Sequence, residues 1–148
     1  MTDISFYHLT TQSLEHALPK LLELTIKSKE RALVVIGNKE RVGFLNEHLW
    51  SYEAGSWLPH GTQDDGDPSE HPIYLSLDNE NPNSATFLFL VDGACGLELD
   101  SFKRVFDLFD GRDEEAVAAA RGRWTSLKSG GHSLSYWRQG DDGRWNKT

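Results

Sequence analysis

The chain contains a single cysteine, Cys95, and it has no run of about eighteen apolar residues, the length that crosses a membrane. One cysteine excludes an internal disulfide and fits a reducing compartment. The opening nine residues, MTDISFYHL, lack the basic and then apolar pattern of a signal peptide. We therefore expect a cytoplasmic protein without membrane contact.

Motifs for cofactors and catalysis are also missing. There is no G-x-x-x-x-G-K-[ST] loop, and the first two expected strands run into HLTTQS and GNKE instead of a glycine-rich turn. The six histidines are scattered without zinc-ligand spacing, and the sequence identifies no base that would activate Cys95. We expect no cofactor, no metal and no catalytic constellation.

Composition predicts one folded domain, residues 1–148, because 38% hydrophobic and 11% aromatic residues suffice for a core in a chain of this size. A net charge of −8 argues against general binding to nucleic-acid phosphate, and only a localised basic patch could do so. Residues 121–148 form such a patch, with six Lys/Arg against two acids and three of the five tryptophans. This end suits docking of an acidic, apolar partner.

Hydrophobic spacing predicts alternating strands and helices. The chain begins strand, helix, strand, helix, which favours parallel strands with right-handed crossovers. We expect a single three-layer Rossmann-like α/β domain: a mixed, mostly parallel sheet flanked by helices, without a phosphate-binding loop. Expected strands are 4–9, 32–36, 73–77, 86–91 and 132–138; expected helices lie near 14–25, 38–50 and 114–128.

Three segments are less regular. The residues Phe102, Val105, Phe106 and Phe109 fall at helical spacing and predict a further core-facing helix. Residues 51–72 are rich in acids and turn formers and predict a surface loop. Pro19 is awkward inside the first helix, which we expect to start later or to kink there, and GDDG before Arg144 and Trp145 predicts a hairpin turn.

One stripe of the last helix carries unusual chemistry. At 100° per residue, Val117, Arg121, Trp124, Thr125 and Lys128 share a face. Cations that flank a tryptophan can hold a carboxylate and an aromatic ring together. The alternative is that Trp124 belongs to the core and the cations are solvated.

A second aromatic group, Trp50, Tyr52 and Trp57, surrounds the end of the second helix. Either these rings extend the core beneath the following loop, or they form a patch that binds a partner.

The ordered motifs FYHL, ALVVIGNKE, LNEHLW, SWLPH, PIYLS, FLFLVDG, VFDLFDG and ARGRWTSLKSGGHSL span nearly the whole chain. In this order and spacing the sequence resembles the chi subunit of bacterial DNA polymerase III, an accessory protein of the clamp-loader complex. The resemblance implies a non-enzymatic adaptor with a fold like that of mononucleotide-binding domains. It also implies binding to the acidic, phenylalanine-ended C-terminal tail of single-stranded DNA-binding protein, in replication or in repair, with only indirect contact to DNA.

Position by position, the resemblance assigns the tail site to Arg121, Trp124 and Thr125. The third position is basic in well-known members, so Thr125 departs from the pattern, and Lys128 or Arg138 is expected to substitute. The resemblance assigns a second site, for the psi subunit or an iron–sulfur helicase, to Trp50 and Trp57.

Two other functions stay open from the residues. A Rossmann-like fold also suits an enzyme that acts on a nucleotide, and nucleotide-dependent thermal stabilisation would favour that class. The tryptophan-rich basic end also suits direct binding to single-stranded DNA, because rings and cations together hold bases.

Overall fold

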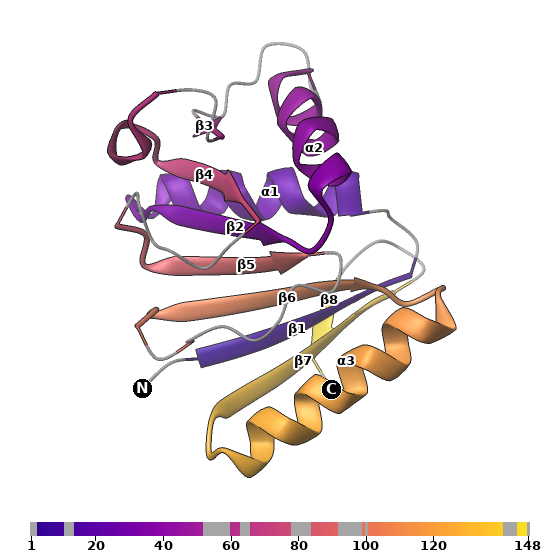
Figure 1. Cartoon of the computed structure of the whole chain (residues 1–148). Coiled ribbons are helices and arrows are strands. Elements are labelled where there is room, and N and C mark those ends of the chain that lie inside the picture. Colours follow the sequence, from indigo (N-terminus) through magenta and orange to yellow (C-terminus); the bar gives the residue numbers. More distant parts are fainter. Residues whose placement is uncertain are drawn as a thin grey trace.

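A computed structural model describes residues 3–10, 14–51, 60–62, 66–77, 84–91, 99, 101–140 and 145–147. Within these residues one sheet has the strand order β3-β4-β2-β5-β6-β1-β7-β8 (Figure 1). The helices are α1 (Leu14–Lys27), α2 (Lys39–Ser51), α3 (Glu114–Ser129) and the short 3₁₀ helix η1 (Pro68–Glu70). The strands are β1 (Asp3–Leu9), β2 (Ala32–Ile36), β3 (His60–Gly61), β4 (Ile73–Ser76), β5 (Phe87–Val91), β6 (Arg104–Asp110), β7 (Ser133–Gln139) and β8 (Trp145–Lys147).

The sheet is parallel from β3 to β7, and β8 joins β7 in the antiparallel direction. Helices α1 and α2 contribute Leu18, Leu22, Leu45 and Leu49 to the core on one face. Helix α3 covers the other face through Ala120 and its partly buried neighbours. The structure confirms the predicted three-layer, mostly parallel α/β fold.

The helix predicted over residues 102–109 is wrong, because the chain forms strand β6 there. Val105 and Phe109 pack toward α3, whereas Phe106 and Leu108 pack toward α1 and α2. Side chains of β6 enter the apolar clusters on both sides of the sheet, and its five middle residues are buried. A strand covered on both faces has a nearly continuous apolar run, and such a run also contains helical spacings.

The predicted surface loop over residues 51–72 holds more structure than expected. Residues 60–61 form edge strand β3, and His60 is only 3% exposed. A His60 ring nitrogen, Nε2, lies 3.0 Å from the Asn46 carbonyl oxygen, which links β3 to α2. In α1, Pro19 is buried inside a helix that begins at Leu14, so the expected later start is wrong. The hairpin turn before Trp145 lies outside the described residues, but β7 and β8 pair on either side of it.

Helix α3 is fixed at its start and at its middle. The Asp113 carboxylate accepts hydrogen bonds from the backbone N–H groups of Glu115 and Ala116, which caps the helix. Further along, the Arg123 guanidinium donates two bonds to the Asp107 carboxylate on β6, at 2.6 and 2.9 Å. The Asp107 side chain is 4% exposed, and its burial raises its pKa while Arg123 opposes that effect.

We expect Asp107→Ala to lower the free energy of unfolding by about 3 kcal/mol, because it leaves a largely buried guanidinium unpaired. Urea denaturation measures this change, and a double-mutant cycle with Arg123→Ala isolates the coupling. The exposed pair Arg112–Asp110 is the matched control, and Arg112→Ala should cost less than about 0.5 kcal/mol. Equal losses from the two pairs would contradict the anchoring role of Asp107.

Candidate functional site

Trp124 lies at the border between the core and the solvent. Its ring is partly buried and makes edge-to-face contacts with Phe6 of β1 at 5.3 Å and Tyr136 of β7 at 5.8 Å between ring centroids. Arg121, one turn earlier on α3, is exposed. The ring therefore packs on the core, as the alternative interpretation of Trp124 predicted, and it lies one turn from an exposed cation; the binding role of the stripe stays a prediction.

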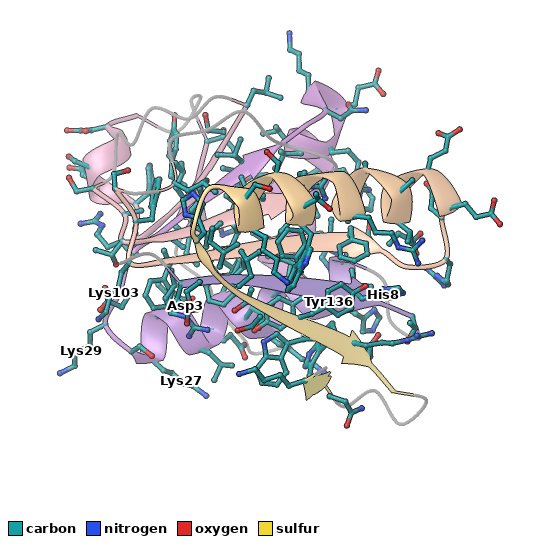
Figure 2. All side chains as sticks on the ribbon, turned by 90° about the horizontal axis from the view of Figure 1, so that it is seen from below. Asp3, His8, Lys27, Lys29, Lys103 and Tyr136 are labelled. Atoms are coloured by element: carbon teal, nitrogen blue, oxygen red, sulfur yellow. The ribbon has the colours of Figure 1, made fainter. Side chains whose placement is uncertain are left out.

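A histidine and a tyrosine join this border through neighbouring strands. Parallel pairing places β1 beside β7, and the His8 Nδ1 atom lies 2.5 Å from the Tyr136 hydroxyl (Figure 2). The positive charges of Arg121 and Arg138 both act on this pair. The structure thus brings Arg121, Trp124 and Arg138 together around Tyr136. We name His8, Arg121, Trp124, Tyr136 and Arg138 the α3–β7 surface.

Burial and nearby charges together shift the pKa values of His8 and Tyr136. Burial lowers the pKa of His8, Arg138 and Arg121 lower it further, and Asp110 opposes them. Burial raises the pKa of Tyr136, and the same two arginines oppose that change. A lowered pKa keeps His8 neutral near pH 7. An anion that neutralised Arg121 and Arg138 would weaken the effect that holds the His8 pKa down.

The remaining predicted members of the stripe differ in placement. Val117 is partly buried against the core, whereas Thr125 and Lys128 are exposed. The Thr125 hydroxyl donates to the Arg121 carbonyl at 3.0 Å. Arg123, counted in the basic end of the sequence, points to Asp107 and is paired there, so it does not add a solvated cation.

The second predicted site falls largely outside the description. Trp57 is not among the described residues, and Trp50 belongs to the last turn of α2 without a described side chain. On α2, however, Phe44 is 50% exposed. The Arg41 guanidinium lies 5.0 Å from the Phe44 ring centroid, and His48 stacks on the same ring at 6.3 Å.

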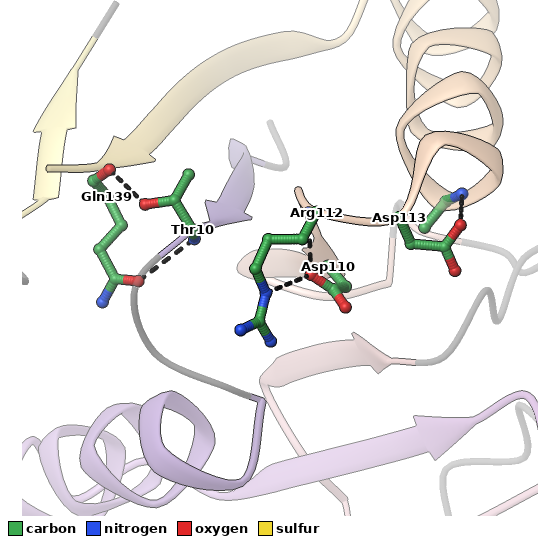
Figure 3. A network of polar contacts seen from close by, with 6 residues as sticks. Thr10, Asp110, Arg112, Asp113 and Gln139 are labelled. Carbon is green, nitrogen blue, oxygen red and sulfur yellow. Dashed lines mark hydrogen bonds and ion pairs between the residues drawn. The ribbon is translucent and has the colours of Figure 1, made fainter. Parts of the chain in front are cut away.

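The carboxyl ends of the strands border a cleft of about 600 Å³ between α1, α2 and the start of α3. Figure 3 shows the polar contacts at this edge, where Arg112 binds Asp110 and Asp113 caps α3. In the same view the Thr10 hydroxyl donates to the Gln139 carbonyl at 2.7 Å, which ties β1 to the end of β7. The Asp113 carboxylate already caps the N-terminal end of α3 at this cleft, so an anion at that helix end would meet like charge.

In the described part of the chain, no three His, Cys, Asp or Glu side chains lie close enough to hold a metal ion. None of the helices described is both long and apolar enough to cross a membrane.

Fold and surface together define a Rossmann-like α/β domain that presents arginines and aromatic rings at one border of its last helix. The family model described as "DNA polymerase III chi subunit, HolC" matches residues 1–135. The chain therefore belongs to the DNA polymerase III chi subunit family, whose members are accessory subunits of the polymerase holoenzyme.

A curated relative is 28% identical over 109 residues, which is 72% of this chain. It is the protein named "Probable DNA polymerase III subunit chi" from Rickettsia prowazekii (strain Madrid E). The matched region spans 66% of that relative's length.

Trp124→Ala is expected to lower the free energy of unfolding by about 2–3 kcal/mol, because it removes a half-buried ring from the contact with Phe6 and Tyr136. Arg121→Ala should change it by less than about 0.5 kcal/mol, since that side chain is exposed. Urea denaturation of both variants tests the difference. A negligible loss for Trp124→Ala would mean that its ring does not support the core.

Proposed function

We propose that this chain is a replication accessory adaptor whose α3–β7 surface binds the acidic C-terminal tail of single-stranded DNA-binding protein. The observation that carries the proposal is the convergence of two exposed arginines, Arg121 and Arg138, on the aromatic pair Trp124 and Tyr136. Membership of the chi family supports the same function.

The chemistry of the surface suits such a tail. Guanidinium groups bind carboxylates through paired, charge-assisted hydrogen bonds. The edges of Trp124 and Tyr136 offer apolar area beside them, and burial of one phenylalanine side chain contributes roughly 1.5–3 kcal/mol. The binding is modest in affinity and sensitive to salt, because most of its charges are exposed.

A second partner, the psi subunit or an iron–sulfur helicase, is proposed to bind near the end of α2, where Trp50 lies. The exposed Phe44, flanked by Arg41 and His48, supports an interface on this helix. Helices α2 and α3 pack on opposite faces of the sheet. Two partners can therefore bind at once, and the domain would link protein-coated single-stranded DNA to the clamp loader or helicase.

The test is a titration with a peptide of the tail sequence, followed by fluorescence anisotropy at low salt. Arg121→Ala should weaken binding by about tenfold, because it removes the central charge of the surface. Thr125→Lys should strengthen binding by about twofold to fivefold, since it adds a cation one position after Trp124.

Arg112→Ala is the matched control, because Arg112 is an exposed arginine beside the first turn of α3 and away from Trp124. Binding by this variant should stay within about twofold of the parent chain. A peptide without its terminal phenylalanine should bind weakly to every variant. If Arg121→Ala and Arg112→Ala bound the full peptide as well as the parent, the assignment of the tail to this surface would fail.

Tail affinity is expected to rise as the pH falls. Bound carboxylates neutralise Arg121 and Arg138, so the pKa of His8 rises on binding and the complex takes up a proton. The gain is present below the His8 pKa of the complex and is lost as the pH rises through it. We expect a stronger affinity at about pH 5.5 than at pH 7.5.

Calorimetric titration in buffers of different ionisation enthalpy measures the proton uptake directly. His8→Gln should abolish both the uptake and the pH dependence. His16→Gln, which changes an exposed histidine on α1, should preserve them. Proton uptake that persisted in His8→Gln would assign the linkage to another group.

A further inference from the structure

Strand β7 carries a second group of rings on the face that is turned away from α3. Its side chains alternate, so Tyr136 and Arg138 face α3 while Trp137 and Gln139 face the opposite side. In the antiparallel pair β7–β8, Trp137 lies opposite Lys147 and Gln139 opposite Trp145. Trp137, Trp145 and Lys147 therefore share one face, which we name the β7–β8 face.

The two indoles sit on a buried tyrosine. Trp137 stacks beside Tyr7 with ring centroids 6.3 Å apart and an interplanar angle of 10°. Trp145 meets the same ring edge-on at 4.9 Å. Tyr7 is only 7% exposed, whereas both indoles are half-buried and keep part of their surface in solvent.

Cations accompany these rings. The exposed Lys147 places its Nζ atom 5.9 Å from the Trp137 ring centroid. Arg104 of β6 lies 4.6 Å from the centroid of Phe106, and Phe106 stacks on Tyr7. Asp3, in register with Arg104 on β1, is the acid that acts on Tyr7 from this side.

Among the described elements, no helix makes extensive contact with β8. Helix α1 packs on β6 and α2, and α3 packs on β6 and β7 from the other face (Figure 2). Trp137 and Trp145 are partly buried and pack against the core here. Both lie after residue 135, the last residue that the family model matches.

We propose that the β7–β8 face binds single-stranded nucleic acid, with bases stacked on Trp137 and Trp145 and phosphates paired with Lys147 and Arg104. Indole faces accept any base by stacking, and neighbouring cations hold the backbone between stacked bases. An acidic peptide would use the cations but would gain little from two indoles on an open sheet. Lys147 and Arg104 supply positive charge beside the rings, which complements phosphate, although the chain as a whole carries −8.

The acidic remainder of the protein keeps this binding weak and sensitive to salt. Tethering makes weak binding useful, because a partner that already coats the strand raises the local concentration of DNA to the millimolar range. The β7–β8 face and the α3–β7 surface lie on opposite faces of one strand. Each can thus be tested without the other: the tethering rests on the tail proposal, whereas the binding of DNA to the β7–β8 face does not.

The experiment measures anisotropy of fluorescein-labelled oligothymidylate with the full chain at about 20 mM salt. Saturable binding is expected, with quenching of tryptophan fluorescence. Trp137→Ala and Lys147→Glu should each weaken binding by about fivefold or more. Lys147 is exposed, so the second variant tests the face even where the first fails to fold.

Arg138→Glu is the matched control, because it makes the same charge change on the neighbouring strand but on the opposite face. It should weaken the tail peptide, and it should weaken oligothymidylate binding much less than Lys147→Glu does, because its side chain lies on the far side of the sheet. Lys147→Glu should leave tail binding unchanged. No saturable binding of oligothymidylate, equal losses in Lys147→Glu and Arg138→Glu, or equal affinity for duplex DNA would overturn the proposal.

Discussion

The ion pair between Asp107 and Arg123 determines how the last helix lies on the sheet. A buried carboxylate on a central strand needs a partner, and only one rotation of α3 brings Arg123 to it. The apolar side of α3, with Val117, Ala120 and Leu127, packs on the same face of the sheet. The pair selects the rotation that packs Trp124, the next residue, against Phe6 and turns Arg121 to solvent. The arrangement of the α3–β7 surface is therefore a consequence of a contact in the core.

Most of the fold could be predicted from local patterns, because strands such as β2 are short apolar runs and the three long helices have regular spacing. The prediction of a helix around β6 was wrong for a physical reason. Val105 and Phe109 serve one core while Phe106 and Leu108 serve the other, so no alternation with polar residues marks a strand. The buried Asp107 adds a polar position that resembles the solvent face of a helix. Only its partner on α3, far along the chain, explains that residue.

Arg121 and Trp124 lie three residues apart on one helix, so they are neighbours on its surface. Their proximity could therefore be inferred from the sequence. The presence of His8 and Tyr136 at the α3–β7 surface could not be inferred in this way, because it depends on β1 and β7 being adjacent in the sheet. Local sequence patterns do not reveal the order of the strands in a sheet. Conversely, the count of positive charges included Arg123, which the fold uses internally. The number of cations in a segment thus overstates the number that face solvent.

The alternation of side chains along β7 limits where this protein can tolerate insertions and deletions. Three consecutive residues, Tyr136, Trp137 and Arg138, are divided between the two faces of the sheet by alternation alone. Insertion or deletion of one residue within the strand would turn each of them to the other side. The Trp137 indole would then lie under α3, and the hydrogen bond between Tyr136 and His8 would be lost. Natural variation in length should therefore be confined to the ends of β7, whereas substitutions within it can adjust one face while the other stays unchanged.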